Sequence, residues 1–197
     1  MGLARELKNN SLVARILNFQ GDRLFYHGDF KSARGLFEQA AQVAAKTTDR
    51  EQILLAKFNV AKVAVKEGRP QEAMKTVKPL AEEADRLGLK YLAVESSIYL
   101  AQALLDSKDY AHARQQLEDS LRVSEKLGLQ AMLAKSHYFL AEALRLGGSP
   151  AEAPHHYAEA LRILDDIRSE AHSDQVLKRN DLATIYQEAA RWQNPKS

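Results

Sequence analysis

The sequence repeats itself every 40 residues, and this period restricts the chain to a stack of similar units. Four phrases begin 40 residues apart: GDFKSA at 28–33, GRPQEA at 68–73, KDYAHA at 108–113 and GSPAEA at 148–153. Small residues lie seven positions before each phrase, and large apolar residues lie four positions after its closing alanine. The small residues are Gly21, Ala61, Ala101 and Ala141, and the large ones are Phe37, Val77, Leu117 and Tyr157.

The pattern within each repeat predicts two α-helices. Good helix formers dominate the composition, while the chain has only 9 glycines and 5 prolines. Glycine opens three of the four phrases, where it can take the left-handed conformation that ends a helix. The small residue then allows the first helix to approach the second closely, and the large residue fills the remaining space. We expect first helices at about 10–27, 50–67, 90–107 and 130–147, and second helices at about 30–47, 70–87, 110–127 and 150–171.

Two helix starts carry a capping box, in which a side chain at each end of the first turn satisfies a backbone N–H of the other end. Ser149-Pro150-Ala151-Glu152 predicts Ser149 as the N-cap of the helix at about 150–171. Thr48-Asp49-Arg50-Glu51 predicts Thr48 as the N-cap of the helix at about 50–67.

The whole chain, 1–197, is predicted to be one repeat domain. The repeats run at about 10–49, 50–89, 90–129 and 130–171, and a capping helix at about 174–192 covers the last pair. Residues 1–8 have two interpretations that stay open. They are the stub of a preceding second helix in an array cut from a longer chain, or a short capping helix.

Composition and charge exclude several classes of function. The net charge is +2, from 28 basic and 26 acidic residues without a basic cluster, so we expect no direct binding of nucleic acid. The chain has no cysteine, which excludes disulfides and thiolate chemistry. No apolar run approaches the about 20 residues that span a bilayer, and the N-terminus lacks a secretory signal. We therefore expect a cytoplasmic protein without a membrane partner.

The ionisable residues suggest no active site. His155 and His156 are adjacent, and neighbouring residues on a helix point about 100° apart, so the two cannot chelate a metal on one face. His112, His137 and His172 have no acid or histidine at a convincing ligand spacing. Phosphate-binding and nucleophile motifs are missing from the sequence as well. We expect no catalytic residue, no metal, no cofactor and no enzymatic activity.

The small residues and closing alanines resemble those of the tetratricopeptide repeat. The usual repeat has 34 residues, and the period of 40 is similar to the longer repeats of spindle-orientation adaptors and of bacterial signalling proteins. This resemblance implies an all-α solenoid of antiparallel helix pairs that form a right-handed superhelix. It also implies a concave face that is built from the first helices and that binds a peptide or a helix.

Carrying the family's binding positions over to this sequence gives a set of candidate partner-binding residues on the concave face. They are Arg15, Asn18, Asp22, Phe25, Tyr26, Phe58, Lys62, Lys66, Glu95, Gln102, Lys135, Tyr138, Glu142 and Arg145. The opposing interpretation, that Phe58, Ile98 and Leu105 pack between helices, is equally favoured. The terminal-carboxylate clamp of chaperone-binding relatives is absent, because only Asn59 matches it and because Asp22 and Glu95 would repel a carboxylate.

The function predicted from the resemblance is a scaffold or adaptor that binds a protein or peptide in its groove. The alternative is a regulatory or sensory module of a larger bacterial signalling protein, such as a serine/threonine kinase or a transcriptional activator. Homo-oligomer formation is compatible with both functions.

Overall fold

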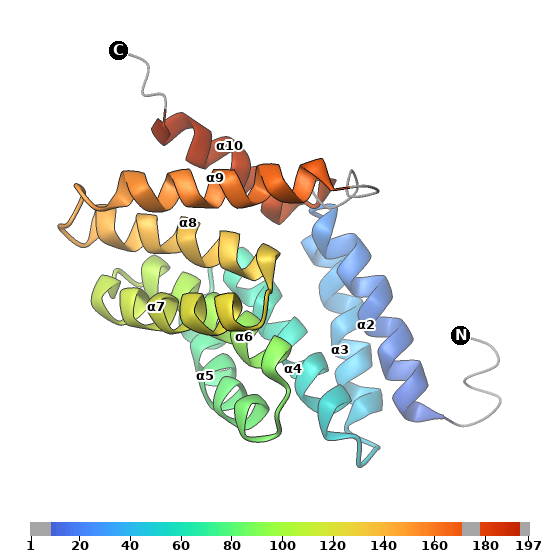
Figure 1. Cartoon of the computed structure of the whole chain (residues 1–197). Helices are drawn as coiled ribbons and strands as arrows, with labels where there is room; N and C mark the ends of the chain where they lie inside the picture. Colours follow the sequence, from blue (N-terminus) through green and yellow to red (C-terminus); the bar gives the residue numbers. More distant parts are fainter. Residues whose placement is uncertain (1–8, 171–177, 194–197) are drawn as a thin grey trace. The chain divides into compact units, whose positions relative to one another are not determined.

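The computed structural model describes residues 9–170 and 178–193, and these residues contain helices and no β-strand. The first helices are α2 (Asn10–Tyr26), α4 (Arg50–Lys66), α6 (Lys90–Asp106) and α8 (Gln130–Leu146). The second helices are α3 (Phe30–Ala44), α5 (Pro70–Arg86), α7 (Tyr110–Lys126) and α9 (Ala153–Ser169), and α10 (Asn180–Gln193) follows them (Figure 1). The prediction of an all-helical array of sequential helix pairs is confirmed.

The first helices end with a backbone turn that the sequence encodes locally. At Gly68, φ is +70°, and the next amide, that of Arg69, donates to the carbonyl of Ala64 at 2.9 Å. Lys108 takes the same place in the third repeat with φ of +63°, and Asp109 N–H donates to the carbonyl of Leu104 at 2.9 Å. Such bonds satisfy helix-end carbonyls, and glycine adopts the required positive φ without steric cost.

The chain forms two compact units, Met1–Ser96 and Ser97–Ser197, and α6 runs across the boundary between them. In the first unit α2 packs against α3 and α4, α3 packs against α4, and α4 packs against α5. Alanines of α2, α3 and α4 share one apolar cluster with larger residues of α2. The cluster contains Val13, Ala14, Leu17, Ala40, Ala44 and Ala56. Because these side chains are small, the helices approach each other closely.

In the second unit α7 packs against α8, α8 packs against α9, and α10 packs against both α8 and α9. Leu182, Ile185 and Ala189 of α10 are buried in the same apolar cluster as Ile163 and Leu164 of α9. Burying one such large aliphatic side chain contributes about 1.5–3 kcal/mol. The last helix therefore covers an apolar face of α9, as the predicted capping helix would.

Two predicted helix starts are wrong in detail. α9 begins at Ala153, after a turn in which Glu152 N–H donates to the carbonyl of Ser149. A helix that begins at Pro150 would need the N–H of residue 154 to donate to the carbonyl of Pro150, and Pro154 has no N–H. The start of α4 uses Asp49 as its N-cap instead of Thr48, and the Asp49 carboxylate accepts from the N–H of Gln52 at 3.1 Å. The predicted start of the last helix, at about 174, lies outside the described residues.

Candidate functional site

The predicted partner-binding residues differ widely in their accessibility. Arg15 and Lys66 are exposed, and Asp22, Tyr26, Glu142 and Arg145 are half-buried. The remaining eight are buried, namely Asn18, Phe25, Phe58, Lys62, Glu95, Gln102, Lys135 and Tyr138. Phe58 has no exposed surface, as expected from the interpretation in which it packs between helices. The partner-binding role of the set as a whole stays a prediction.

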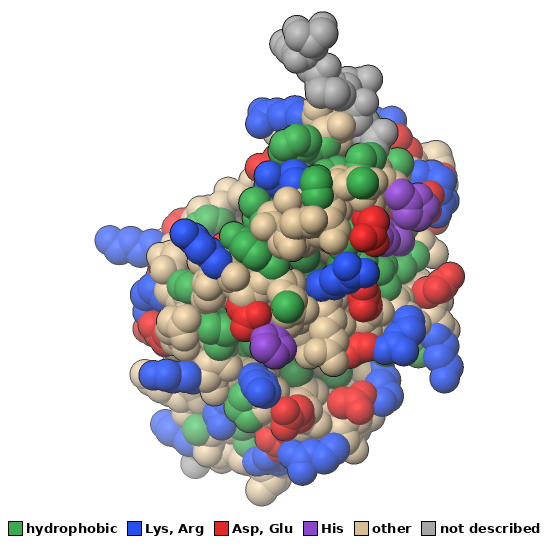
Figure 2. All heavy atoms as spheres, turned by 90° about the vertical axis from the view of Figure 1, so that its left-hand side faces the viewer, with side chains coloured by type: hydrophobic (Ala, Val, Ile, Leu, Met, Phe, Trp, Pro, Cys, Tyr) green, Lys and Arg blue, Asp and Glu red, His purple; other side chains and the backbone are tan. Residues whose placement is uncertain are grey.

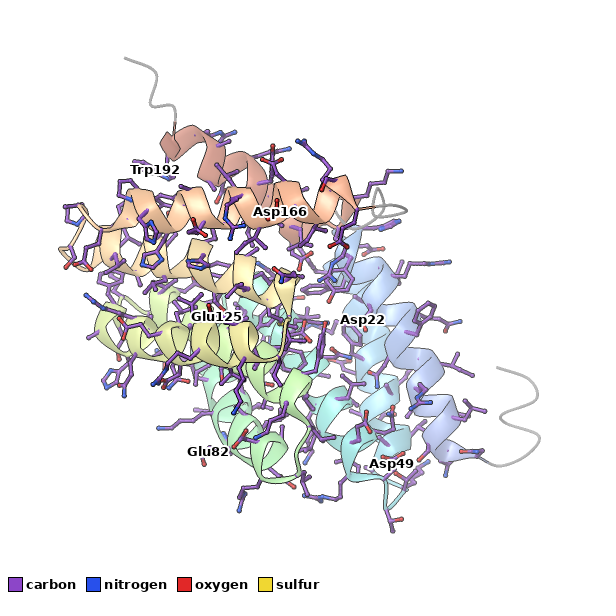
Figure 3. All side chains as sticks on the ribbon, viewed as in Figure 1. Asp22, Asp49, Glu82, Glu125, Asp166 and Trp192 are labelled. Atoms are coloured by element: carbon purple, nitrogen blue, oxygen red, sulfur yellow. The ribbon has the colours of Figure 1, made fainter. Side chains whose placement is uncertain are left out.

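In the first unit, an ion pair joins two candidate residues that are 40 positions apart. The Lys62 ammonium on α4 donates to Asp22 Oδ1 on α2 at 2.7 Å. Lys62 is only 1% exposed, and its Nζ lies 4.6 Å from the ring centroid of Phe25 and 5.3 Å from that of Tyr26. A buried ammonium is costly unless it is paired, and the aromatic faces add cation–π attraction to the carboxylate's charge. Figure 3 labels Asp22 on α2.

A second polar contact between the same helices lies one helical turn away. Asn59 Nδ2 donates to Asn18 Oδ1 at 3.1 Å, and both side chains are buried. Three of the predicted residues, Asn18, Asp22 and Lys62, thus join α2 to α4 within the first unit. Their contacts hold α2 against α4. The exposed residues Arg15 and Lys66 lie on the same two helices.

In the second unit, a buried ion pair connects α8 with the beginning of α10. Lys135 Nζ lies 2.5 Å from Asp181 Oδ2, and the side chains are 3% and 7% exposed. Arg179 makes a second ion pair with Asp181 at 2.9 Å. Burial by itself would raise the pKa of Asp181, but the charges of Lys135 and Arg179 outweigh it and hold the pKa below its usual range. Asp181 is therefore ionised at neutral pH, and its contacts fix α10 on α8.

Tyrosine–carboxylate hydrogen bonds join α8 to α10 and to α9. Tyr138 donates its hydroxyl proton to Glu188 of α10, and Tyr157 of α9 donates to Glu142. Arg145 bonds Glu142 Oε2 at 2.5 Å. Burial and the hydrogen bonds to carboxylates raise the pKa of both Tyr138 and Tyr157, so the hydroxyls keep their protons.

Trp192 completes these contacts at the far end of α10 (Figure 3). Its ring stacks on Tyr157 with centroids 5.9 Å apart, and the Arg145 guanidinium lies 4.6 Å from its centroid. The candidate residues of α8 are thus contacted by α10, a helix that the sequence analysis treated only as a cap. The acid–base pairs here are satisfied structural contacts, and the geometry offers no nucleophile with an adjacent base among the described residues.

Two histidines that are far apart in the sequence are in contact in the second unit. His137 of α8 and His156 of α9 face each other with their Nδ1 atoms 3.0 Å apart, a contact over 19 residues that an analysis of ligand spacing along the sequence does not reveal. Burial, followed by the charge of His156, lowers the pKa of His137 to about 4. Burial lowers the pKa of His156 as well. The sequence held no signal for this contact, because His137 is nine residues before the end of α8 whereas His156 is only three residues after the start of α9.

A groove of about 520 Å³ opens on the first unit between α3, α4 and α5. Its lining is mostly apolar and includes none of the predicted binding residues. The lining residues are Ala41, Leu54, Lys57, Val60, Ala61, Glu72, Thr76, Pro79, Leu80 and Glu83. The volume is within the range of about 300–1,000 Å³ that is usual for ligand pockets.

Charges of both signs are interspersed on the face drawn in Figure 2, which has no extended field of one sign. Within the described ranges, none of the helices has the length and the apolar character that a membrane span requires.

Comparison with known proteins gives one direct match of sequence to a family. Residues 96–127 match the tetratricopeptide repeat model. This segment is a tetratricopeptide repeat. It contains most of α6 and all of α7, which are the first and second helices of the third repeat. The tetratricopeptide repeat is a non-catalytic fold, and it matches the helix-pair architecture that the 40-residue period predicts.

Solved structures show the same fold over nearly the whole chain. The apo form of RapI matches with a TM-score of 0.66 and 18% identity, over 93% of this chain and 70% of RapI. A Rap protein complexed with competence and sporulation factor matches with a TM-score of 0.72 and 18% identity, over 93% of this chain and 56% of that protein. Tetratricopeptide-like repeats of a putative kinesin light chain of Podosopora anserina match with a TM-score of 0.64 and 20% identity, over 96% and 98% of the two chains. No curated protein sequence matches the chain.

Proposed function

We propose that this tetratricopeptide-repeat chain is a protein-interaction module that binds a peptide or a helix on the side of its first helices. The observation that carries the proposal is the likeness of the fold to a Rap protein complexed with competence and sporulation factor. The second support is the arrangement of the candidate residues. Buried side chains hold the first helices rigidly, and accessible side chains of the types that anchor partners lie beside them.

The proposed contact residues are the accessible members of the predicted set. Arg15, Asp22, Tyr26 and Lys66 belong to the first unit, and Glu142 and Arg145 belong to the second. Arginine and tyrosine are enriched among residues that dominate binding energy. The buried members, such as Asn18, Lys62 and Lys135, act by keeping the helices in place.

The experiment is a selection of binding peptides from a displayed random library on the full chain, followed by affinity measurements on variants. We expect Tyr26→Ala to weaken a peptide that binds the first unit, and Arg145→Ala a peptide that binds the second unit, each at least about tenfold, which is the loss of one modest hot spot of about 1.4 kcal/mol. The control is Phe19→Ala, which removes a ring that is 73% exposed from α2, the same helix that carries Tyr26. Binding should stay unchanged in this control.

Thermal melts of the same variants separate binding from folding. If Tyr26→Ala lowers the melting temperature strongly and leaves binding intact, Tyr26 is a core residue and has no role in recognition. Thr76→Trp, which fills the groove between α3, α4 and α5, tests the other concavity of the first unit. A peptide that loses affinity only in this variant would contradict the proposed surface, and a library without any binder would contradict the function.

A regulatory role is the second candidate. By analogy with the Rap protein complexed with competence and sporulation factor, a peptide bound by this chain would control an activity attached to it. A selected peptide that changes the affinity of the chain for a second protein would distinguish regulation from simple scaffolding.

A further inference from the structure

The fold brings two imidazoles together across a helix pair, outside the proposed binding surface. His137 lies in α8 and His156 in α9, their Nδ1 atoms are 3.0 Å apart and their ring centroids are 5.2 Å apart. α8 and α9 pack against each other along their lengths within the second unit. Both side chains are half-buried, so the pair is held by the scaffold and still reaches solvent.

At neutral pH both rings are uncharged, so in each ring one nitrogen carries a hydrogen and the other has a lone pair. With two Nδ1 atoms facing each other, one must carry a proton to form a hydrogen bond. Besides His155, the charged groups around the pair are three carboxylates and two guanidinium groups, an excess of one negative charge. They are Glu159 and Arg162 of α9, Glu152 before it, and Arg114 and Glu118 of α7.

We propose that His137 and His156 form a two-histidine site for a divalent transition-metal ion of the class Cu²⁺, Ni²⁺ and Zn²⁺. Neutral imidazole is a preferred ligand of these ions. With metal–nitrogen bonds of about 2.0–2.1 Å, two ligands lie about 2.8 Å apart at a right angle and about 3.4 Å apart at a tetrahedral angle. The observed 3.0 Å lies between these values and nearer to the first, which is typical of square-planar Cu²⁺ and Ni²⁺.

The two rings must tilt for their lone pairs to converge on one ion, because in the hydrogen-bonded arrangement the nitrogens point at each other. The rotation concerns the second side-chain torsion of histidine, which has a broad energy well. The described residues contain no group of three ligand side chains, so solvent would complete the coordination. His155 is exposed, and its ring centroid is 5.2 Å from that of His156.

An ion held in this way bridges the two helices of the last pair and binds the folded state alone, so it stabilises the second unit. Figure 2 shows histidine side chains lying together at the surface near the upper right of the view. The site does not depend on the proposed peptide binding, since none of its residues belongs to the predicted binding set.

The test uses the full chain without an affinity tag, stripped of metal by a chelator that is then removed. Titration with Ni²⁺ and with Cu²⁺ should give saturable binding of one ion per chain and raise the melting temperature. His137→Gln and His156→Gln should each weaken binding at least tenfold and abolish the shift in melting temperature. His155→Gln is the matched control and should bind like the wild type, because His155 is adjacent in sequence and exposed.

The electron paramagnetic resonance spectrum of the Cu²⁺ complex should show coupling to two imidazole nitrogens, and in His156→Gln this coupling should be lost. This measurement does not depend on the stability of the variants, whose folding is checked by circular dichroism. The proposal is overturned if the wild type binds no ion, if His156→Gln binds as tightly as the wild type, or if His155→Gln loses binding to the same extent as His156→Gln.

Discussion

Gly21 of α2 faces the ring of Phe37 on α3 so closely that even a methyl group does not fit. A Cβ atom at Gly21 would lie 2.4 Å from Cε1 and 2.7 Å from Cδ1 of Phe37. Phe37 has no exposed surface, so its ring cannot turn out into solvent. We therefore predict that Gly21→Ala destabilises the first unit, although alanine is the better helix former.

Two opposing contributions determine the magnitude. Alanine in place of glycine inside a helix favours folding by about 1 kcal/mol. Carbon atoms pack at about 3.5–4.0 Å, so the ring of Phe37 or the helix must move by more than about 1 Å. Overpacking of this kind costs about 1–3 kcal/mol, and an overlap so large belongs at the upper end. The net expectation is a loss of about 2 kcal/mol in the free energy of unfolding.

A compensating change is already present in the second repeat. There the positions of Gly21 and Phe37 are occupied by Ala61 and Val77, a pair in which a methyl group on one helix accompanies a smaller side chain on the other. Phe37→Val alone should destabilise the unit by leaving a cavity. The double variant Gly21→Ala/Phe37→Val should be more stable than the sum of the single changes by more than about 1 kcal/mol, because the methyl group fills part of that cavity.

Urea unfolding of the four proteins, monitored by far-ultraviolet circular dichroism, measures these differences. The argument fails if Gly21→Ala raises the stability by about 1 kcal/mol, as it would on an exposed helix face. Strict additivity in the double variant would also refute it, because two side chains in contact should be coupled.

Three further outcomes follow from the described contacts. Lys108→Gly should raise the melting temperature, because a lysine at positive φ costs about 1 kcal/mol or more and glycine adopts this φ freely. The same change at exposed Lys75, in the interior of α5, should lower the melting temperature. The Asp181 carboxylate has a pKa below its usual range, so the stability that its ion pairs provide is fully present above about pH 4 and is lost as the pH falls below that value. Asp181→Asn should therefore lower the melting temperature at neutral pH. In melts recorded below pH 4, the variant should lose less stability with falling pH than the wild type does. Removal of residues 178–197 should expose the face of α9 that α10 covers and promote self-association in light scattering, and a truncated chain that stays monomeric with unchanged melting would show that α10 is not a cap.

Most of the fold was predictable, because a repeat architecture depends on residues that are close together in the sequence. Ala61, Ala101 and Ala141 indicated where helices approach, and the positive-φ positions such as Gly68 indicated where first helices end. Those features depend on a few neighbouring residues and recur at a fixed period, so one sequence contains them several times. The family match at 96–127 lies in the third of these repeats.

The start of α9 was predicted less well, because two local signals compete there. Ser149 and Pro150 have the composition of a helix start, but Pro154 has no N–H to donate to the carbonyl of Pro150, and the helix begins at Ala153. Two prolines four residues apart each favour a helix start, and the capping pattern alone does not say which one prevails.

The candidate site was predictable only as a set of positions. The register places Asp22 and Lys62 at equivalent points of successive first helices, but it does not reveal that the lysine is buried against aromatic rings. Lys135 and Tyr138 were expected in a groove, whereas α10 supplies Asp181 and Glu188 as their partners. Their partners lie on a helix 46 and 50 residues further along the chain, which has no repeat signal of its own.

By itself, the sequence determined the helix pairs, their period and the small residues at their contacts, because short-range propensity and periodic burial are properties of neighbouring residues. Only the tertiary structure decided which polar side chains meet. His137 and His156, Lys135 and Asp181, and Tyr138 and Glu188 each join different helices. Such pairs depend on the angle and separation at which two helices pack, and that geometry is the sum of many apolar contacts rather than the property of any one residue.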